Sequence, residues 1–226
     1  MKGLLIKDLK IILNQKKLFI IAILFGAFFA YTNEDVTFAA TYIVILMSML
    51  ALTTISYDDI NGGMLFILSL PTTRKLYVIE KYLFTALNLL CSCVASIIIC
   101  MIMGQLFGID VNTGTVIAST AGSTVGVGLM LAVNIPLEFK YGVEKSRTAI
   151  FISVAAIAVV IVGGYKLLTE VLHVDLKGMA MDVLSKLPSN QAAQDAIIAG
   201  AFLLVLVIIL AISYVFSYKI MMKKEY

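Results

Sequence analysis

The sequence predicts an all-α integral membrane protein with six transmembrane helices. Of its 226 residues, 61% are hydrophobic and only 14% are charged, which leaves too little polar surface for a soluble domain of this length. Six apolar runs without Asp, Glu, Lys, Arg or His are separated by short polar segments, and a helix needs about 20 residues to cross the bilayer core. The expected spans are residues 18–33, 36–56, 82–103, 115–137, 148–165 and 196–218. The loops that remain leave no room for a soluble domain, so residues 1–226 are predicted to form a single transmembrane domain.

Residues 1–17 are predicted to form an amphipathic helix that lies in the membrane interface. Lys7 and Lys10 recur at helical spacing, while Leu5 and Leu9 line another face. The lysines are expected to face lipid headgroups. The alternative is that they serve only as a topology signal.

The distribution of basic residues predicts the orientation. Of the 17 Lys and Arg residues, 14 lie in the N-terminal arm, in the segments after spans two and four, and in the tail; Lys166, Lys177 and Lys186 lie on the opposite side. The positive-inside rule then places both termini in the cytoplasm. The segment 166–195 becomes extracytoplasmic, and its mixed apolar and charged residues predict short amphipathic helices on the outer membrane face.

The residue types that most enzymes need are missing from the predicted membrane core. The only histidine, His173, has no second ligand nearby, and no G-x-x-x-x-G-K-[ST] phosphate loop occurs. The spans hold no ionisable acid or base, so a non-catalytic chain without a metal site is expected. Glu80 is the nearest acid to a span, and it is interpreted as interfacial. The net charge of +3 is too small to indicate nucleic-acid binding.

The fourth span is rich in small residues. Gly122, Gly126 and Gly128 allow helices to approach closely in lipid, either to pack within the chain or to line a path. Asn134 and Pro136 are expected to mark a kink or the end of this helix.

The segment 57–75, "YDDINGGMLFILSLPTTRK", is predicted to be cytoplasmic and to hold a short helix. Asp58 or Asp59 can cap that helix, and Pro71 can end it. Thr72 or Thr73 can start the next helix. A glycine pair costs about 1 kcal/mol per glycine inside a helix, so close approach by another backbone would explain it. The sequence favours a docking element for a partner protein.

Three stretches resemble the ABC-2-type transporter permeases of bacteria. They are "SYDDINGGMLFILSLPTTRKLYVIEKYL" at 56–83, "IPLEFKYGVEKSR" at 135–147, and the opening "MKGLLIKDL". The chain is most similar to the small permeases of phenol-soluble modulin and bacteriocin-type peptide exporters. The resemblance implies a membrane subunit without its own ATPase. Two such subunits pair, each carries a cytoplasmic ABC ATPase, and ATP and Mg bind to that partner while this chain binds no cofactor.

The resemblance also implies which residues couple the membrane subunit to the ATPase. The segment 57–75 would be the coupling loop, and residues 141–144 would form a second contact. The first set is Tyr57, Asp58, Asp59, Asn61, Gly62, Gly63, Met64, Leu65 and Leu70; the second is Tyr141, Gly142 and Glu144. The glycine at the second position of the pair departs from the family pattern, which has a bulkier residue there.

The function expected from these observations is that of the membrane subunit of an ATP-driven exporter in the cell membrane. Its expected partners are an ABC ATPase, a second copy of the chain or a related permease, and the lipid bilayer. The expected substrate is a hydrophobic or amphipathic peptide. Two alternatives remain at this stage: an ion-coupled secondary carrier, and a membrane-embedded immunity protein.

Overall fold

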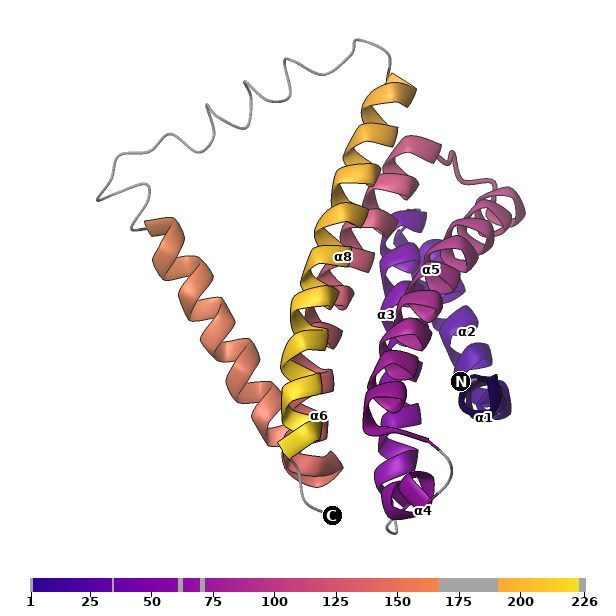
Figure 1. Ribbon diagram of the computed structural model, residues 1–226. Helices are drawn as coiled ribbons and strands as arrows, with labels where there is room; N and C mark the ends of the chain where they lie inside the picture. The colour runs from indigo at the N-terminus through magenta and orange to yellow at the C-terminus, as the bar shows by residue number, and fades with distance from the viewer. Residues whose placement is uncertain (1, 34, 61–62, 70–71, 167–190, 224–226) are drawn as a thin grey trace.

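The structure is a computed structural model that describes residues 2–33, 35–60, 63–69, 72–166 and 191–223. The described residues form helices joined by short connections (Figure 1). These helices are α1 (Lys2–Asn14), α2 (Lys16–Asn33), α3 (Val36–Asp59), α4 (Gly63–Ser69), α5 (Arg74–Phe107), α6 (Thr113–Lys166) and α8 (Gln191–Lys223). The all-α prediction is confirmed for this part of the chain.

Five helical segments in the described residues are long and apolar enough to cross a membrane. They are Lys16–Asn33, Val36–Asp59, Arg74–Phe107, Thr113–Gly142 and Leu203–Lys223. They contain the predicted spans one to four and most of span six. The predicted fifth span, 148–165, is helical within α6, but its side chains lie outside the description, so the count of six stays a prediction. Most of the predicted outer segment, at 167–190, also lies outside the described residues, as does His173.

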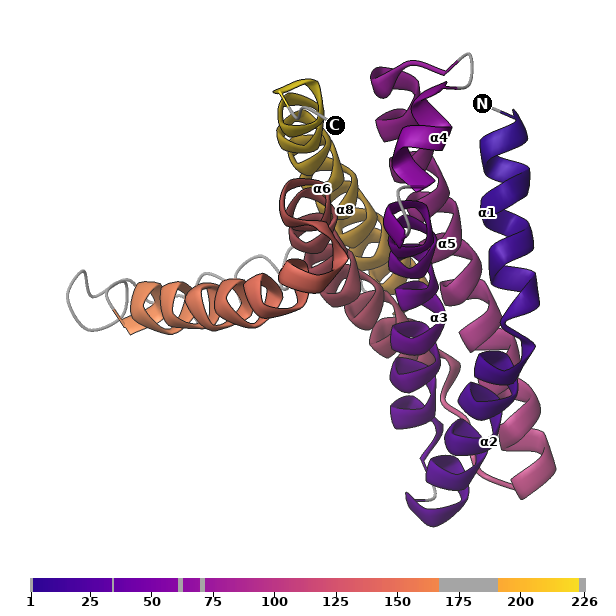
Figure 2. The ribbon, with the colours of Figure 1, turned by 90° about the horizontal axis from the view of Figure 1, so that it is seen from below.

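The helix α3 lies at the centre of the bundle. It packs against α2, α5 and α6, while α8 packs along α6 and α5 (Figure 1). Side chains of α1, α3, α4, α5, α6 and α8 meet in the largest apolar core, where Val44, Leu89, Leu131 and Ile135 are fully buried. The helix α1 is different because it runs crosswise to α8: it is seen end-on in Figure 1 and along its length in Figure 2. This direction fits a helix that lies flat in a membrane interface.

Short polar side chains tie the apolar helices together. The hydroxyl oxygens of Ser48 on α3 and Ser92 on α5 are 2.8 Å apart. The phenol oxygen of Tyr82 on α5 lies 2.6 Å from the Ser213 hydroxyl and 2.7 Å from the Ser217 hydroxyl, both on α8. Because water is scarce inside a membrane, such groups are satisfied across helix interfaces, and they hold α3, α5 and α8 in register.

The bend in α6 lies at Gly142, where the backbone has φ 74° and ψ 173°. The helix continues through Pro136, so the predicted end at Asn134 and Pro136 is wrong, and the backbone leaves the helical region at Gly142 instead. The physical reason is that a proline removes one backbone donor, whereas this φ/ψ combination reverses the chain and is essentially restricted to glycine. After the bend, α6 diverges from α8 in both views (Figures 1 and 2).

The three glycines of the fourth span have different surroundings. At Gly128 a Cβ atom would lie 2.0 Å from the Leu206 Cδ1 of α8. This glycine therefore permits close packing of α6 on α8. A Cβ at Gly122 or Gly126 would meet nothing within 4 Å. These two positions do not serve packing among the described residues.

Candidate coupling site

The helix α4 presents one apolar face to the bundle and another away from it. The predicted short helix is present, although Asp58 and Asp59 belong to the last turn of α3 and do not cap it. Met64 is 5% exposed, whereas Leu65 and Phe66 are 57% and 67% exposed. Burial of Met64 attaches α4 to the bundle. The outer face of α4 carries the exposed apolar side chains of Leu65 and Phe66.

Two local features position α4. A Cβ at Gly63 would lie 2.8 Å from the carbonyl oxygen of Asp58, so the close backbone approach predicted for the glycine pair is present at its second member. On the other side, Thr73 caps α5, and its hydroxyl accepts a hydrogen bond from the Leu76 N–H at 3.2 Å. This confirms the predicted helix start.

Asp58 lies in a buried ion cluster that joins α1, α3 and α5. Its carboxylate is 4% exposed, accepts a hydrogen bond from Lys7, and lies 2.7 Å from the Lys81 Nζ. Lys81 also lies 2.5 Å from the Asp8 Oδ2. The Tyr77 hydroxyl donates to the Asp58 Oδ2 at 3.1 Å. Asp58 thus connects the end of α3 to the crosswise helix α1, and it is not available on the surface.

The opposite charges of the lysines and the carboxylates stabilise the cluster. Lys81 and Asp8 are 1% and 0% exposed, and ions this deeply buried are stable only when they are paired. Burial by itself would lower the pKa of Lys7, but the hydrogen bond and charge of Asp58, together with the charge of Asp8, outweigh burial and raise that pKa above 10.5. Lys7 therefore stays protonated at neutral pH. It does not face headgroups freely, as was expected, because the carboxylates hold it.

Glu80 belongs to the interior as well. It was expected at the membrane interface, yet its side chain is 0% exposed. Neither of its carboxylate oxygens accepts a hydrogen bond from an N–H or hydroxyl group of the described residues, while the carboxyl group of Asp8 lies within hydrogen-bonding reach. Lys81, Asp8 and Lys7 are the charged groups that act on it. Glu80 is therefore enclosed by the protein, beside Asp8 of α1, and its depth in the membrane stays a prediction.

The two predicted loop contacts meet at one end of the bundle. A Cβ at Gly142 would lie 2.9 Å from the Asp59 Oδ2, which places the bend of α6 beside the end of α3. Figure 1 shows this bend, α4 and the last turn of α8 at the same end. We call it the α4 end. Tyr141 is 45% exposed there, and the Lys140 ammonium lies 4.9 Å from its ring centroid.

The predicted site residues therefore separate into groups. Tyr57, Leu65 and Tyr141 are exposed. Asp58 and Met64 are buried, and Asp59 lies against Gly142. The residues Asn61, Gly62 and Leu70, and the side chain of Glu144, lie outside the description.

Sequence reasoning missed Lys81 and Tyr77, the buried partners of Asp58, and also Asp8, which shares Lys81 with Asp58. One signal was present: Leu4, Asp8 and Ile12 follow one another at a spacing of four, and all three are buried. An acid in the middle of an apolar stripe indicates a buried ion pair. Within the described part of the chain, no group of three or more His, Cys, Asp or Glu side chains is placed to hold a metal ion.

The fold defines a multi-pass helical membrane protein in which two segments distant in the sequence converge at one end. Residues 3–222 match the family model described as ABC-2 family transporter protein. The match covers nearly all of the chain, and the protein belongs to the ABC-2 transporter family. No curated protein matches the chain. Membership of this family makes it a membrane transport component and implies an ABC ATPase partner.

Proposed function

We propose that the chain is the membrane subunit of an ATP-driven exporter, and that it docks its ATPase at the α4 end. The single observation that carries the proposal is the convergence of α4 and the Gly142 bend of α6 at that end. A partner that binds there can contact both segments at once. The excess of Lys and Arg in the segments at this end supports its assignment to the cytoplasm.

The outer face of α4 supplies the proposed docking surface. Leu65 and Phe66 are apolar and exposed in the isolated chain, and a short apolar helix can insert into a groove on a partner. The inner face is anchored by Met64 and Ile67, which are 5% and 6% exposed. Movement of the docked ATPase would therefore reach α3 and α5 through packed side chains.

Co-purification with the ATPase tests this proposal. Phe66→Asp should abolish binding of the ATPase encoded beside this chain, because a charge on the docking surface must be desolvated. The matched control is Leu106→Asp, since Leu106 is 74% exposed and lies near the other end of α5, so it should bind as the wild type does. If Phe66→Asp and Leu106→Asp bind the ATPase equally well, docking does not use α4.

We further propose that the cargo is a hydrophobic or amphipathic peptide and that two copies of the chain form the pathway. The uncharged spans support this cargo, because a charged substrate would need compensating groups in the membrane. ATP-dependent accumulation of a labelled amphipathic peptide in inside-out vesicles tests the assignment. Accumulation that is equal with and without the ATPase would contradict it.

One observation favours an ion-coupled carrier as a second candidate. Glu80 is a fully buried carboxyl group beside the carboxyl group of Asp8, and buried acids in membrane proteins often carry protons. Transport by vesicles that contain a proton gradient, but neither ATP nor the ATPase, would select this candidate. Loss of that transport in Glu80→Gln would place the proton on Glu80.

A further inference from the structure

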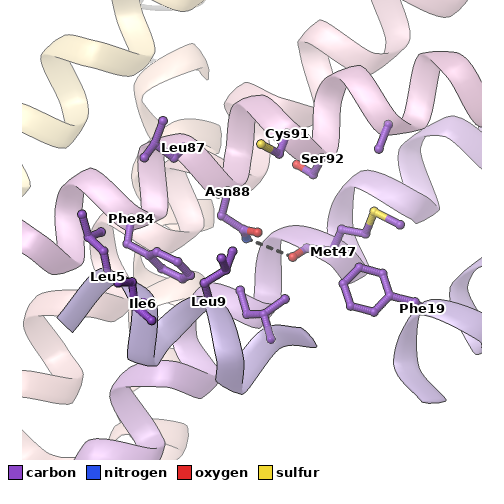
Figure 3. A pocket seen from close by; sticks show the side chains of 12 residues that line it. Leu5, Ile6, Leu9, Phe19, Met47, Phe84, Leu87, Asn88, Cys91 and Ser92 are labelled. Atoms are coloured by element: carbon purple, nitrogen blue, oxygen red, sulfur yellow. Dashed lines mark hydrogen bonds between the residues drawn. The ribbon is translucent and has the colours of Figure 1, made fainter. Parts of the chain in front are cut away.

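An apolar cavity lies between the crosswise helix α1 and the helices α2, α3 and α5. Its volume is about 520 Å³, and side chains from all four helices close around it (Figure 3). The residues that define its walls include Leu9, Phe19, Met47, Phe84 and Leu87. This volume is within the range of ligand pockets in proteins, roughly 300–1,000 Å³. The cavity lies apart from α4 and from the docking surface proposed above.

The polar side chains in the wall already have partners. Asn88 donates its amide hydrogens to the carbonyl oxygen of Met47 at 3.0 Å (Figure 3) and to that of Ser48 at 3.3 Å. The Ser92 hydroxyl donates to the carbonyl oxygen of Leu89 at 2.8 Å. No charged residue is among those that line the cavity. The interior therefore suits a hydrocarbon chain and offers little to a polar ligand.

The α1 side of the cavity carries positive charge. Ile6 lines the cavity and is 54% exposed. Lys2 and Lys10 lie one helical turn before and after it, so the three side chains form one row along α1. Both lysines are exposed, and neither has an ion-pair partner among the described residues. An apolar interior beside a cationic row complements an amphiphile that has an anionic head and an alkyl tail.

We propose that this cavity binds an acyl chain of an anionic phospholipid whose phosphate contacts Lys2 and Lys10. Size favours a lipid over an amphipathic peptide. A helix about 10 Å across with a pitch of 5.4 Å occupies roughly 420 Å³ per turn, so the cavity holds little more than one turn. A flexible acyl chain is narrower and can follow the groove under α1. The lipid would fasten α1 to α5 at the membrane interface.

Lipid retention by the purified full-length chain tests the inference. The chain is reconstituted with equal amounts of phosphatidylglycerol and phosphatidylcholine that carry the same acyl chains. It is then extracted, and the lipid that it retains is identified by native mass spectrometry. We expect retained phosphatidylglycerol to exceed phosphatidylcholine by roughly tenfold, given the two lysines. The double variant Lys2→Gln/Lys10→Gln should bring the two lipids close to equality.

A matched pair of α5 variants tests the cavity itself. Leu87 lines it and is 48% exposed, whereas Leu90 does not line it and is 47% exposed. Leu87→Trp should fill the cavity and remove the retained lipid, and Leu90→Trp should keep it. Equal retention by the two variants, or equal retention of both lipids by the wild type, overturns the proposal because either result indicates ordinary boundary lipid.

Thiol labelling provides a second measurement in the unsubstituted chain, so the test does not depend on folding of the tryptophan variant. Cys91 lines the cavity and is exposed, while Cys93 does not line it. Phosphatidylglycerol should slow the maleimide labelling of Cys91 and leave Cys93 unchanged. An amphipathic peptide that protects Cys91 better than the lipid identifies a peptide groove and overturns the lipid assignment. Cross-linking of Cys91 between two copies in the presence of the lipid shows that a second chain covers the cavity, and it also overturns the assignment.

Discussion

Replacement of Lys81 by methionine should detach α1 from the bundle. Lys81 is 1% exposed and lies 2.5 Å from an oxygen of Asp8 and 2.7 Å from an oxygen of Asp58. Methionine has a similar length but no charge, so it removes the cation and leaves two buried carboxylates with only Lys7 between them. Lys7 is one-third exposed and already contacts both carboxylates, Asp58 and, at 3.2 Å, Asp8, so a single cation would remain for two buried acids.

The expected cost follows from the burial of the pair. Removal of one partner of a buried ion pair costs about 3–5 kcal/mol. At about 2–4 °C per kcal/mol for a chain of this size, the melting temperature should fall by roughly 6–20 °C. The double variant Lys81→Met/Asp8→Asn should lose less than the sum of the two single variants, because it removes both the cation and one of the carboxylates it neutralises.

Thermal unfolding in detergent, followed by size-exclusion chromatography, measures the loss, and hydrogen exchange of the α1 amides shows where it occurs. Lys10→Met is the control, because Lys10 is an exposed lysine on α1 without an ion pair in the described residues. The reasoning is refuted if Lys81→Met has the same melting temperature as Lys10→Met. It is also refuted if the effects of Lys81→Met and Asp8→Asn simply add in the double variant.

Three further predictions concern the α6 glycines and Lys7. Gly142→Ala should destabilise the chain by about 1–3 kcal/mol, since φ 74° with ψ 173° suits glycine alone. In the same melting assay, the control Gly122→Ala should be neutral or up to about 1 kcal/mol stabilising. Equal melting temperatures of the two variants would contradict the bend at Gly142. Gly128→Ala should lower the melting temperature more than Gly126→Ala, because only the Gly128 position is filled by a side chain of α8; the reverse order would be incompatible with this packing. The raised pKa of Lys7 means that its stabilising contribution is fully present below pH 10.5 and is lost as the pH rises through the higher folded value. The stability difference between wild type and Lys7→Met should therefore be constant at neutral pH and shrink in alkaline buffer, and a difference that grows there would contradict the ion pair.

Local chemistry in the sequence was sufficient to predict most of the described helices and some of their ends. Apolar runs predicted the membrane-spanning helices of the described residues, and Thr73 was one of two residues predicted to start α5. The segment 57–75 was predicted to hold a short helix, which is α4. These features depend on neighbours in the sequence: on the hydropathy of consecutive residues, and on a hydroxyl that reaches an N–H three residues later. The amphipathic pattern of the N-terminal arm likewise predicted the helix α1.

Only the tertiary structure decided which side chains face one another. A membrane-spanning helix can bury an apolar face against lipid or against protein at a similar cost, so its hydropathy does not reveal which face packs. For this reason the sequence could not pair Asp8 with Lys81, show that the protein encloses Glu80, or place Gly142 beside Asp59. Asp58 shows the difference most directly, because the family resemblance implied a residue that meets the ATPase, whereas its contacts with α1 and α5 make it an internal link.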